Sequence, residues 1–226
     1  MSAEGAKVIL SQVKADPSTV LGLATGSTPV GMYTELIGAY KNGECDFSQV
    51  RTFNLDEYYP IGRTHEQSYY RFMREKLFDG INVPAENINI PNGEASDAEL
   101  ECSQYDERIA EAGGIDVMVL GVGMNGHIGF NEPAQELEAA THITELDDST
   151  REANSRFFDK LEDVPTQALT MGMRSILSAK KILLLISGES KRPLLEKLLS
   201  GKISTDCPVT LLNTVRDLVV VTDIKL

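Results

Sequence analysis

Short runs of aliphatic and β-branched residues alternate with stretches of helical periodicity along this chain. We expect strands at 20–24, 50–55, 115–122, 182–187 and 218–222. We expect helices around 8–13, between 28–29 and 42–43, over 69–78 and around 194–199. This alternation is typical of an α/β fold with a mostly parallel sheet. No linker rich in Pro, Gly or Ser interrupts the pattern, so one domain over residues 1–226 is expected.

The charge balance and the hydropathy of the chain argue against two classes of partner. Of the 226 residues, 21 are Lys or Arg and 34 are Asp or Glu, which gives a net charge of −13. Sequence-independent binding of nucleic acid requires a basic surface, so no nucleic-acid partner is expected. The longest apolar runs, such as 182–186 and 218–221, are far shorter than the ~18 residues of a membrane span. No secretion signal is visible at the N-terminus, so we expect no membrane partner either.

The cysteines and histidines are few and widely spaced. Three cysteines without C-x-x-C spacing cannot all pair with each other: Cys45, Cys102 and Cys207. Free thiols in a reducing cytoplasm are therefore the expected state. None of the three histidines has a partner at metal-ligand spacing: His65, His127 and His142. We therefore expect no metal site.

In open α/β sheets, ligands bind outside the carboxyl ends of the strands, and the first such end carries the segment 25–29. Gly26 permits a tight turn, Ser27 or Thr28 can cap a helix, and Pro29 suits the first helical position. A helix that starts there offers N–H groups and the positive end of its dipole to a phosphate. An ordinary capped turn between a strand and a helix explains the same residues equally well.

The second strand end carries two adjacent carboxylates, Asp56 and Glu57. A carboxylate at the rim of a cleft can remove a proton from carbon next to a carbonyl, especially if burial raises its pKa. By themselves, however, these two residues are more simply interpreted as a solvated pair at the start of a loop.

The third strand end, 121–133, contains a G-x-G-x-x-G sequence. A dinucleotide-binding motif of this kind should open a long helix, but Gly129 and Pro133 would interrupt one, so we reject that interpretation. His127 lies among the glycines, with Asn125 before it and Glu132 after it. A nearby carboxylate can hold an imidazole in one tautomer, which favours acid–base work over an incidental surface histidine.

These three segments and two others resemble the glucosamine-6-phosphate deaminase family. They are 25–29 (Thr-Gly-Ser-Thr-Pro), 53–58 (Phe-Asn-Leu-Asp-Glu-Tyr), 126–133 (Gly-His-Ile-Gly-Phe-Asn-Glu-Pro), 153–158 (Ala-Asn-Ser-Arg-Phe-Phe) and 188–191 (Gly-Glu-Ser-Lys). The matches occur in the same order from about residue 21 to residue 191, and the run 127–133 is the most specific of them.

The resemblance implies a modified Rossmann-like, doubly wound fold with helices on both faces of the sheet. It implies conversion of glucosamine 6-phosphate and water to fructose 6-phosphate and ammonia, without cofactor or metal. Asp56 takes the place of the base that moves a proton between C2 and C1, and His127 and Glu132 take the places of the ring-opening pair. The implied phosphate ligands are Gly26, Ser27, Thr28, Arg156 and Lys191.

The sequence departs from the longer, allosterically regulated members of that family. Asn125 stands where they have an aspartate; it can orient the histidine but adds no negative charge, so we expect a similar role with a different pH dependence. His142 and Thr144 stand where those members have basic residues that bind an activator, and the chain ends at Leu226 without their extension. We therefore expect a monomer or small homo-oligomer, with 142–164 as a lid over the site.

Two other functions remain open at this stage. A lactonase for a phosphorylated sugar acid shares the implied fold and phosphate loop, but it needs only one base to activate water. A sugar-phosphate sensor would bind without turnover, and it usually carries a DNA-binding segment for which residues 1–22 are too short.

Overall fold

The computed structural model describes residues 1–155, 158 and 160–225. Its main sheet has six strands, all parallel, in the order β4-β2-β1-β5-β8-β9. The strands are β1 (Val20–Leu23), β2 (Arg51–Asn54), β4 (Ile88–Asn89), β5 (Val117–Leu120), β8 (Lys181–Ile186) and β9 (Leu218–Thr222). The expected α/β fold with a mostly parallel sheet is confirmed, and the ends of each expected strand lie within two residues of the predicted ones.

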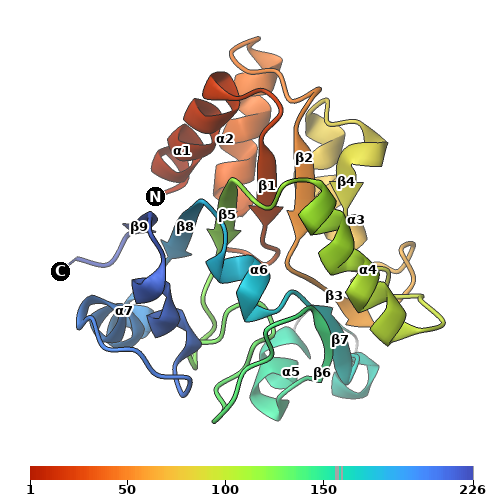
Figure 1. The fold of residues 1–226 in the computed structure, drawn as a ribbon, viewed down its shortest axis with the longest axis vertical. Coiled ribbons are helices and arrows are strands. Elements are labelled where there is room, and N and C mark those ends of the chain that lie inside the picture. Colours follow the sequence, from red (N-terminus) through yellow and green to blue (C-terminus); the bar gives the residue numbers. More distant parts are fainter. Residues whose placement is uncertain (156–157, 159, 226) are drawn as a thin grey trace.

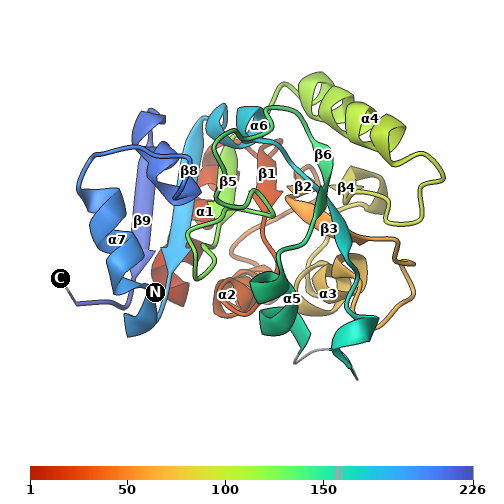
Figure 2. The ribbon, with the colours of Figure 1, turned by 90° about the horizontal axis from the view of Figure 1, so that it is seen from below.

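Helices cover both faces of this sheet, as in a doubly wound fold (Figure 2). One face packs against α1 (Ser2–Ala15), α2 (Val30–Lys41) and α3 (Tyr69–Lys76), and the other against α4 (Ala98–Glu111), α6 (Met173–Leu177) and α7 (Arg192–Leu199). The alternation of β5 shows the division: Val117 and Val119 join the first apolar cluster, and Met118 and Leu120 join the second. All four side chains are buried, which explains the continuous apolar run in the sequence.

A second, antiparallel sheet lies below the carboxyl ends of the parallel strands (Figure 1). It consists of β3 (Asp56–Tyr59), β7 (Gln167–Thr170) and β6 (His142–Glu145), and β6 leads into α5 (Asp148–Ser155). Only Leu55 separates β2 from β3. Its N–H donates to Leu23 O of the large sheet at 3.0 Å, and its carbonyl accepts from Met171 N, just after β7, at 2.7 Å. The end of β2 is therefore fixed in both sheets.

Short 3₁₀ helices complete the fold. They span Phe78–Gly80, Ala85–Asn87, Leu161–Asp163, Glu189–Lys191 and Pro208–Thr214. In the part of the chain that the structure describes, no helix is both long and apolar enough to cross a membrane.

The structure differs from the sequence-based expectations in three elements. None of the expected helices or strands falls in the segment 144–164, which contains the end of β6 and the helix α5. Asp56 and Glu57 lie in strand β3 rather than at the start of a loop. Helix α4 was not predicted, although Asp97 caps it and Cys102, Tyr105 and Ile109 recur on its buried side.

Candidate active site

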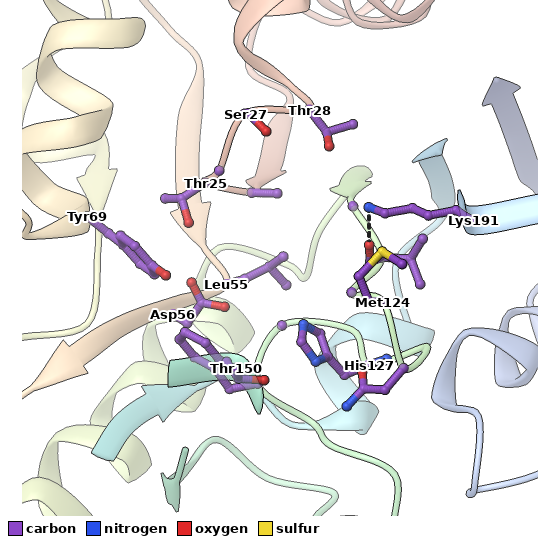
Figure 3. A pocket seen from close by; sticks show the side chains of 18 residues that line it. Thr25, Ser27, Thr28, Leu55, Asp56, Tyr69, Met124, His127, Thr150 and Lys191 are labelled. Carbon is purple, nitrogen blue, oxygen red and sulfur yellow. Dashed lines mark hydrogen bonds between the residues drawn. The ribbon is translucent and has the colours of Figure 1, made fainter. Parts of the chain in front are cut away.

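A cavity of about 520 Å³ opens where the carboxyl ends of the parallel strands face the small sheet (Figure 3). Its walls come from the ends of β1, β2 and β5, from the first residue of β3, and from α3, α5 and the 3₁₀ helix Glu189–Lys191 before α7. The residues that line it include Gly26, Ser27, Thr28, Asp56, Tyr69, Gly123, Asn125, His127, Thr150 and Lys191. Three sequence segments that were singled out separately thus meet in one cavity.

The turn after β1 forms one wall. Gly26 has a φ of +85°, a conformation that other residues rarely adopt, so the glycine is required by the turn itself. Helix α2 begins at Val30 with Pro29 as its N-cap, and no described side chain caps it. The Ser27 and Thr28 hydroxyls therefore do not serve the capping role expected from the sequence. They face the cavity with the uncapped helix start, an arrangement that suits an anion (Figure 3).

Lys191 enters the same region from the 3₁₀ turn before α7. Its ammonium donates to the carbonyl of Val122 at 2.5 Å, and burial lowers its pKa. The cation lies beside Thr28 and Met124 at the end of the cavity opposite Asp56 (Figure 3). Arg156, the other implied phosphate ligand, lies outside the described residues.

Asp56 occupies the other side of the cavity. Asp56 is only 6% exposed, and its carboxylate accepts no hydrogen bond from the residues that the structure describes. Burial raises its pKa to about 8, and the neighbouring charge of Glu57 adds to this effect. The hydroxyl of Tyr69 points toward the carboxylate (Figure 3). A carboxylate with so few partners and a raised pKa is a strong base once it is ionised.

Glu57 points to the other face of the small sheet, because successive strand residues alternate. It accepts backbone N–H groups of Tyr58 at 3.0 Å and of Tyr69 and Tyr70 at 2.8 Å, and so holds the start of α3. Burial raises its pKa to about 7, and these three hydrogen bonds offset part of that effect. The solvated-pair interpretation of Asp56 and Glu57 is wrong: both are buried, and they face different surroundings.

His127 and Glu132 form a pair in the third wall. Nδ1 of His127 lies 3.0 Å from the Glu132 carboxylate. A Cβ added at Gly123 would clash with Nε2 of the same ring, so the ring packs closely against that glycine. Burial raises the pKa of Glu132, but hydrogen bonds from His127, Thr150 and Asn125 and the attraction of His127 outweigh it and leave the pKa below its ordinary value. An ionised Glu132 holds the proton of the imidazole on Nδ1 and leaves Nε2 as an acceptor.

Asn125 stabilises this pair from two directions. Its Oδ1 accepts the backbone N–H of His127 at 3.2 Å, and its Nδ2 donates to Glu132 at 2.6 Å. The backbone donor fixes which end of the amide faces which partner, because a reversed amide would bring two acceptors together. An aspartate here would place a second carboxylate against Glu132.

Two lining residues were not recognised in the sequence. Thr150 on α5 donates to Glu132 at 2.7 Å, and Tyr69 on α3 faces Asp56. Thr150 lies in a polar segment of poor periodicity, and Tyr69 lies in an expected helix whose position in space the sequence does not show. Among the described residues, no group of three or more His, Cys, Asp or Glu side chains is placed to hold a metal ion.

Comparison with known proteins gives close relatives over nearly the whole chain. Glucosamine-6-phosphate deaminase of Clostridium botulinum (strain Loch Maree / Type A3) is 52% identical over 223 residues, covering 99% of this chain and 91% of the relative. The enzyme of the same name from Clostridium novyi (strain NT) is 50% identical over 223 residues, covering 99% of this chain and 92% of the relative.

A solved structure with the same name as these relatives also matches this chain. A monomeric glucosamine-6-phosphate deaminase matches with a TM-score of 0.95 and 42% identity, covering 98% of this chain and 92% of that one. A 6-phosphogluconolactonase from Thermotoga maritima shares the fold alone, at 19% identity and a TM-score of 0.74 over 96% and 94% of the two chains. The family model described as glucosamine-6-phosphate isomerases/6-phosphogluconolactonase matches residues 1–221. This chain belongs to the glucosamine-6-phosphate isomerase/6-phosphogluconolactonase family.

Proposed function

We propose that this protein converts glucosamine 6-phosphate and water to fructose 6-phosphate and ammonia. The observation that carries the proposal is the Asp56 carboxylate, which is buried, free of hydrogen bonds from described residues and in one cavity with His127 and the Gly26 turn. Relatives at about half identity that carry the name of this activity support it. The reaction is an internal isomerisation followed by hydrolysis, so its chemistry requires neither cofactor nor metal.

The 6-phosphate binds at the wall that holds the Gly26 turn. Gly26, Ser27 and Thr28 offer backbone N–H and hydroxyl donors, and Lys191 offers a positive charge, with Arg156 as a further ligand. Local cations and oriented dipoles are needed because a chain of net charge −13 repels an anionic substrate at long range.

His127 opens the sugar ring. Nε2 takes the proton of the O1 hydroxyl, the C1–O1 double bond forms, the C1–O5 bond breaks, and the proton returns to O5. Glu132 stabilises the imidazolium that exists between these two transfers, since it faces Nδ1 at 3.0 Å. Asn125 and Thr150 hold Glu132 in place.

Asp56 then removes the proton from C2 of the open sugar and delivers it to C1. A proton of the amine moves to O1, which leaves C1 as CH₂OH and C2 as an imine. Water adds to C2, ammonia leaves, and the ketone of fructose 6-phosphate remains. The segment 142–164, which contributes Thr150 to the cavity wall, acts as a lid that keeps bulk water from the intermediate.

The enzyme works as a monomer or small homo-oligomer in the cytoplasm, without nucleic-acid or membrane partners. The likeness to a solved monomeric deaminase supports the small assembly. Free, buried thiols at Cys45, Cys102 and Cys207 support a reducing compartment.

The test is to supply glucosamine 6-phosphate and to follow ammonia and fructose 6-phosphate together. The wild type should form the two products in equal amounts, and Asp56→Asn should lower kcat by about 10²- to 10⁴-fold, because Asn cannot accept the C2 proton. Asp206→Asn, which changes an exposed aspartate outside the cavity, is the matched control and should retain full activity.

Two results would contradict the proposal. If the wild type forms neither product but hydrolyses the lactone of 6-phosphogluconate, the function is that of a lactonase. If Asp56→Asn turns over as fast as the wild type, Asp56 is not the base.

A further inference from the structure

Three side chains converge on the Glu132 carboxylate, and one of them comes from a different part of the fold. Asn125 donates to Oε2 at 2.6 Å, and Nδ1 of His127 lies 3.0 Å from the carboxylate. Both belong to the loop after β5. Thr150 Oγ1 donates to Oε1 at 2.7 Å from the third residue of α5. Both oxygens of Glu132 thus have a partner: Oε2 from side chains of its own loop, and Oε1 from Thr150, which lies 18 residues further along the chain.

We propose that Thr150 is a positioning residue for ring opening: its hydroxyl fixes the orientation in which Glu132 accepts the Nδ1 proton of His127. Nε2 of His127 then faces the cavity as the proton acceptor. This inference rests on the proposed function for its kinetic consequence, but the hydrogen-bond arrangement is a property of the protein without substrate.

The surroundings of Thr150 distinguish the positioning of Glu132 from a role in simple packing. Thr150 is 7% exposed and lines the cavity together with His127 (Figure 3), and its hydroxyl donates to Glu132. Helix α5 has a separate attachment, because the Arg151 guanidinium donates to the carbonyls of Leu161 and Val164, at 3.3 Å each. Loss of the Thr150 hydroxyl should therefore leave α5 in place and free one oxygen of Glu132.

Without Thr150, Glu132 can rotate about its side-chain bonds and lose its alignment with Nδ1. The imidazole then distributes its proton over both nitrogens, and the fraction with Nε2 available as acceptor falls. The described titratable group in contact with Glu132 is His127; Asp56 on β3, Tyr69 on α3 and Lys191 before α7 line other walls of the cavity. A change in the tautomer of His127 thus reports on this contact.

The experiment compares three variants. Thr150→Val removes the hydroxyl and keeps the β-branched shape, and Thr150→Ser keeps the hydroxyl. Thr34→Val is the matched control, because Thr34 lies on the exposed side of α2, where its hydroxyl donates to the Val30 carbonyl.

The first measurement needs no substrate. Nitrogen-15 NMR of the imidazoles, above their ordinary pKa of about 6.5, should show His127 mostly protonated on Nδ1 in the wild type, Thr150→Ser and Thr34→Val. In Thr150→Val the fraction protonated on Nδ1 should fall. With only three histidines in the chain, single substitutions of His65 and His142 assign the signals.

The second measurement is turnover of glucosamine 6-phosphate. Thr150→Val should lower kcat about tenfold or more with KM changed less than about threefold, and Thr150→Ser should recover most of the loss. An unchanged His127 tautomer in Thr150→Val overturns the inference, and so does a Thr150→Ser variant as impaired as Thr150→Val. Absence of ammonia with the wild type would instead refute the proposed function, while the NMR result still decides the role of Thr150.

Discussion

Asp56 shows how a single residue can oppose stability and serve chemistry. Its carboxylate is buried without hydrogen bonds from the described residues, and its pKa is raised to about 8. In the unfolded chain an aspartate has a pKa of about 3.9. The folded state therefore binds this proton more tightly, so that ionising Asp56 destabilises the fold increasingly as the pH rises from about 4 to about 8.

The effect of Asp56→Asn on stability should therefore depend on pH. Asp56→Asn, which carries no charge, should raise the free energy of unfolding by roughly 1–3 kcal/mol at pH values near 8, and by much less near pH 5. Thermal or urea unfolding at the two pH values measures the difference. Asp206→Asn should show no such pH-dependent gain. A destabilised Asp56→Asn at high pH would mean that the carboxylate has a favourable partner in the folded state.

Residue-level sequence reasoning succeeded where the local backbone decides the outcome. The G-x-G-x-x-G run opens no helix in the described chain, as Gly129 and Pro133 indicated, and Gly26 makes the expected turn. The sequence does not identify Thr150 or Tyr69 as site residues, because their roles depend on which distant residues they face. The capping role expected for Ser27 or Thr28 is absent in the described structure, since Pro29 occupies the cap.

At the scale of elements, α3 depends on a carboxylate from β3. Glu57 accepts two N–H groups at the start of this helix, and Tyr69 from the same turn lines the cavity. One strand thus carries the proposed base on one side and the anchor of a neighbouring helix on the other. The strand was not predicted, because a run that begins with Asp56-Glu57 lacks the apolar alternation of a typical strand.

The substitution Glu57→Ala leaves the backbone N–H groups of Tyr58, Tyr69 and Tyr70 without their acceptor. Removing a buried carboxyl group offsets this loss of stability only in part. The free energy of unfolding should fall by about 2 kcal/mol, and kcat should fall with it as Tyr69 loses its position. Urea unfolding and turnover measure the two effects.

The matched control is Ser68→Ala, which removes the N-cap hydrogen bond to Arg71 N from the same helix. It should cost about 1 kcal/mol with a smaller effect on kcat. If Glu57→Ala is no less stable than Ser68→Ala, the burial cost of the carboxyl group outweighs its hydrogen bonds.

At the scale of the whole molecule, a strongly acidic protein holds a site built for an anion. The net charge of −13 repels a sugar phosphate at a distance, and in the proposed function Lys191 and the start of α2 attract it at close range. Added salt weakens the long-range repulsion more than the close-range attraction, because the local donors are partly buried. The value of kcat/KM should therefore stay level or rise as ionic strength increases from about 0.02 to about 0.15 M.

Steady-state kinetics in a salt series checks this prediction. A steep fall of kcat/KM over the same range would mean that an extended positive field guides the substrate. Lys191→Met provides the contrast: it should raise KM by about tenfold or more at every ionic strength, since it removes a contact rather than a long-range field.

The architecture as a whole was predictable because buried parallel strands have continuous apolar runs and the helices between them have clear periodicity. The small sheet was not, since β6 and β7 are short, partly polar and paired over long sequence distances. The edge of the parallel sheet where the cavity opens is therefore predictable from sequence, and the antiparallel sheet that presents the proposed base becomes visible only in the structure.

The single residue between β2 and β3 has a consequence for which sugars can react. Leu55 hydrogen-bonds to β1 on one side and to the chain after β7 on the other, so hydrogen-bonded backbone sets the distance between the proposed phosphate-binding turn and the proposed base. That fixed distance determines which carbon of a bound phosphosugar lies at Asp56. A phosphosugar one carbon longer or shorter between phosphate and amine would present the wrong carbon to Asp56, and would remain unreacted even when bound.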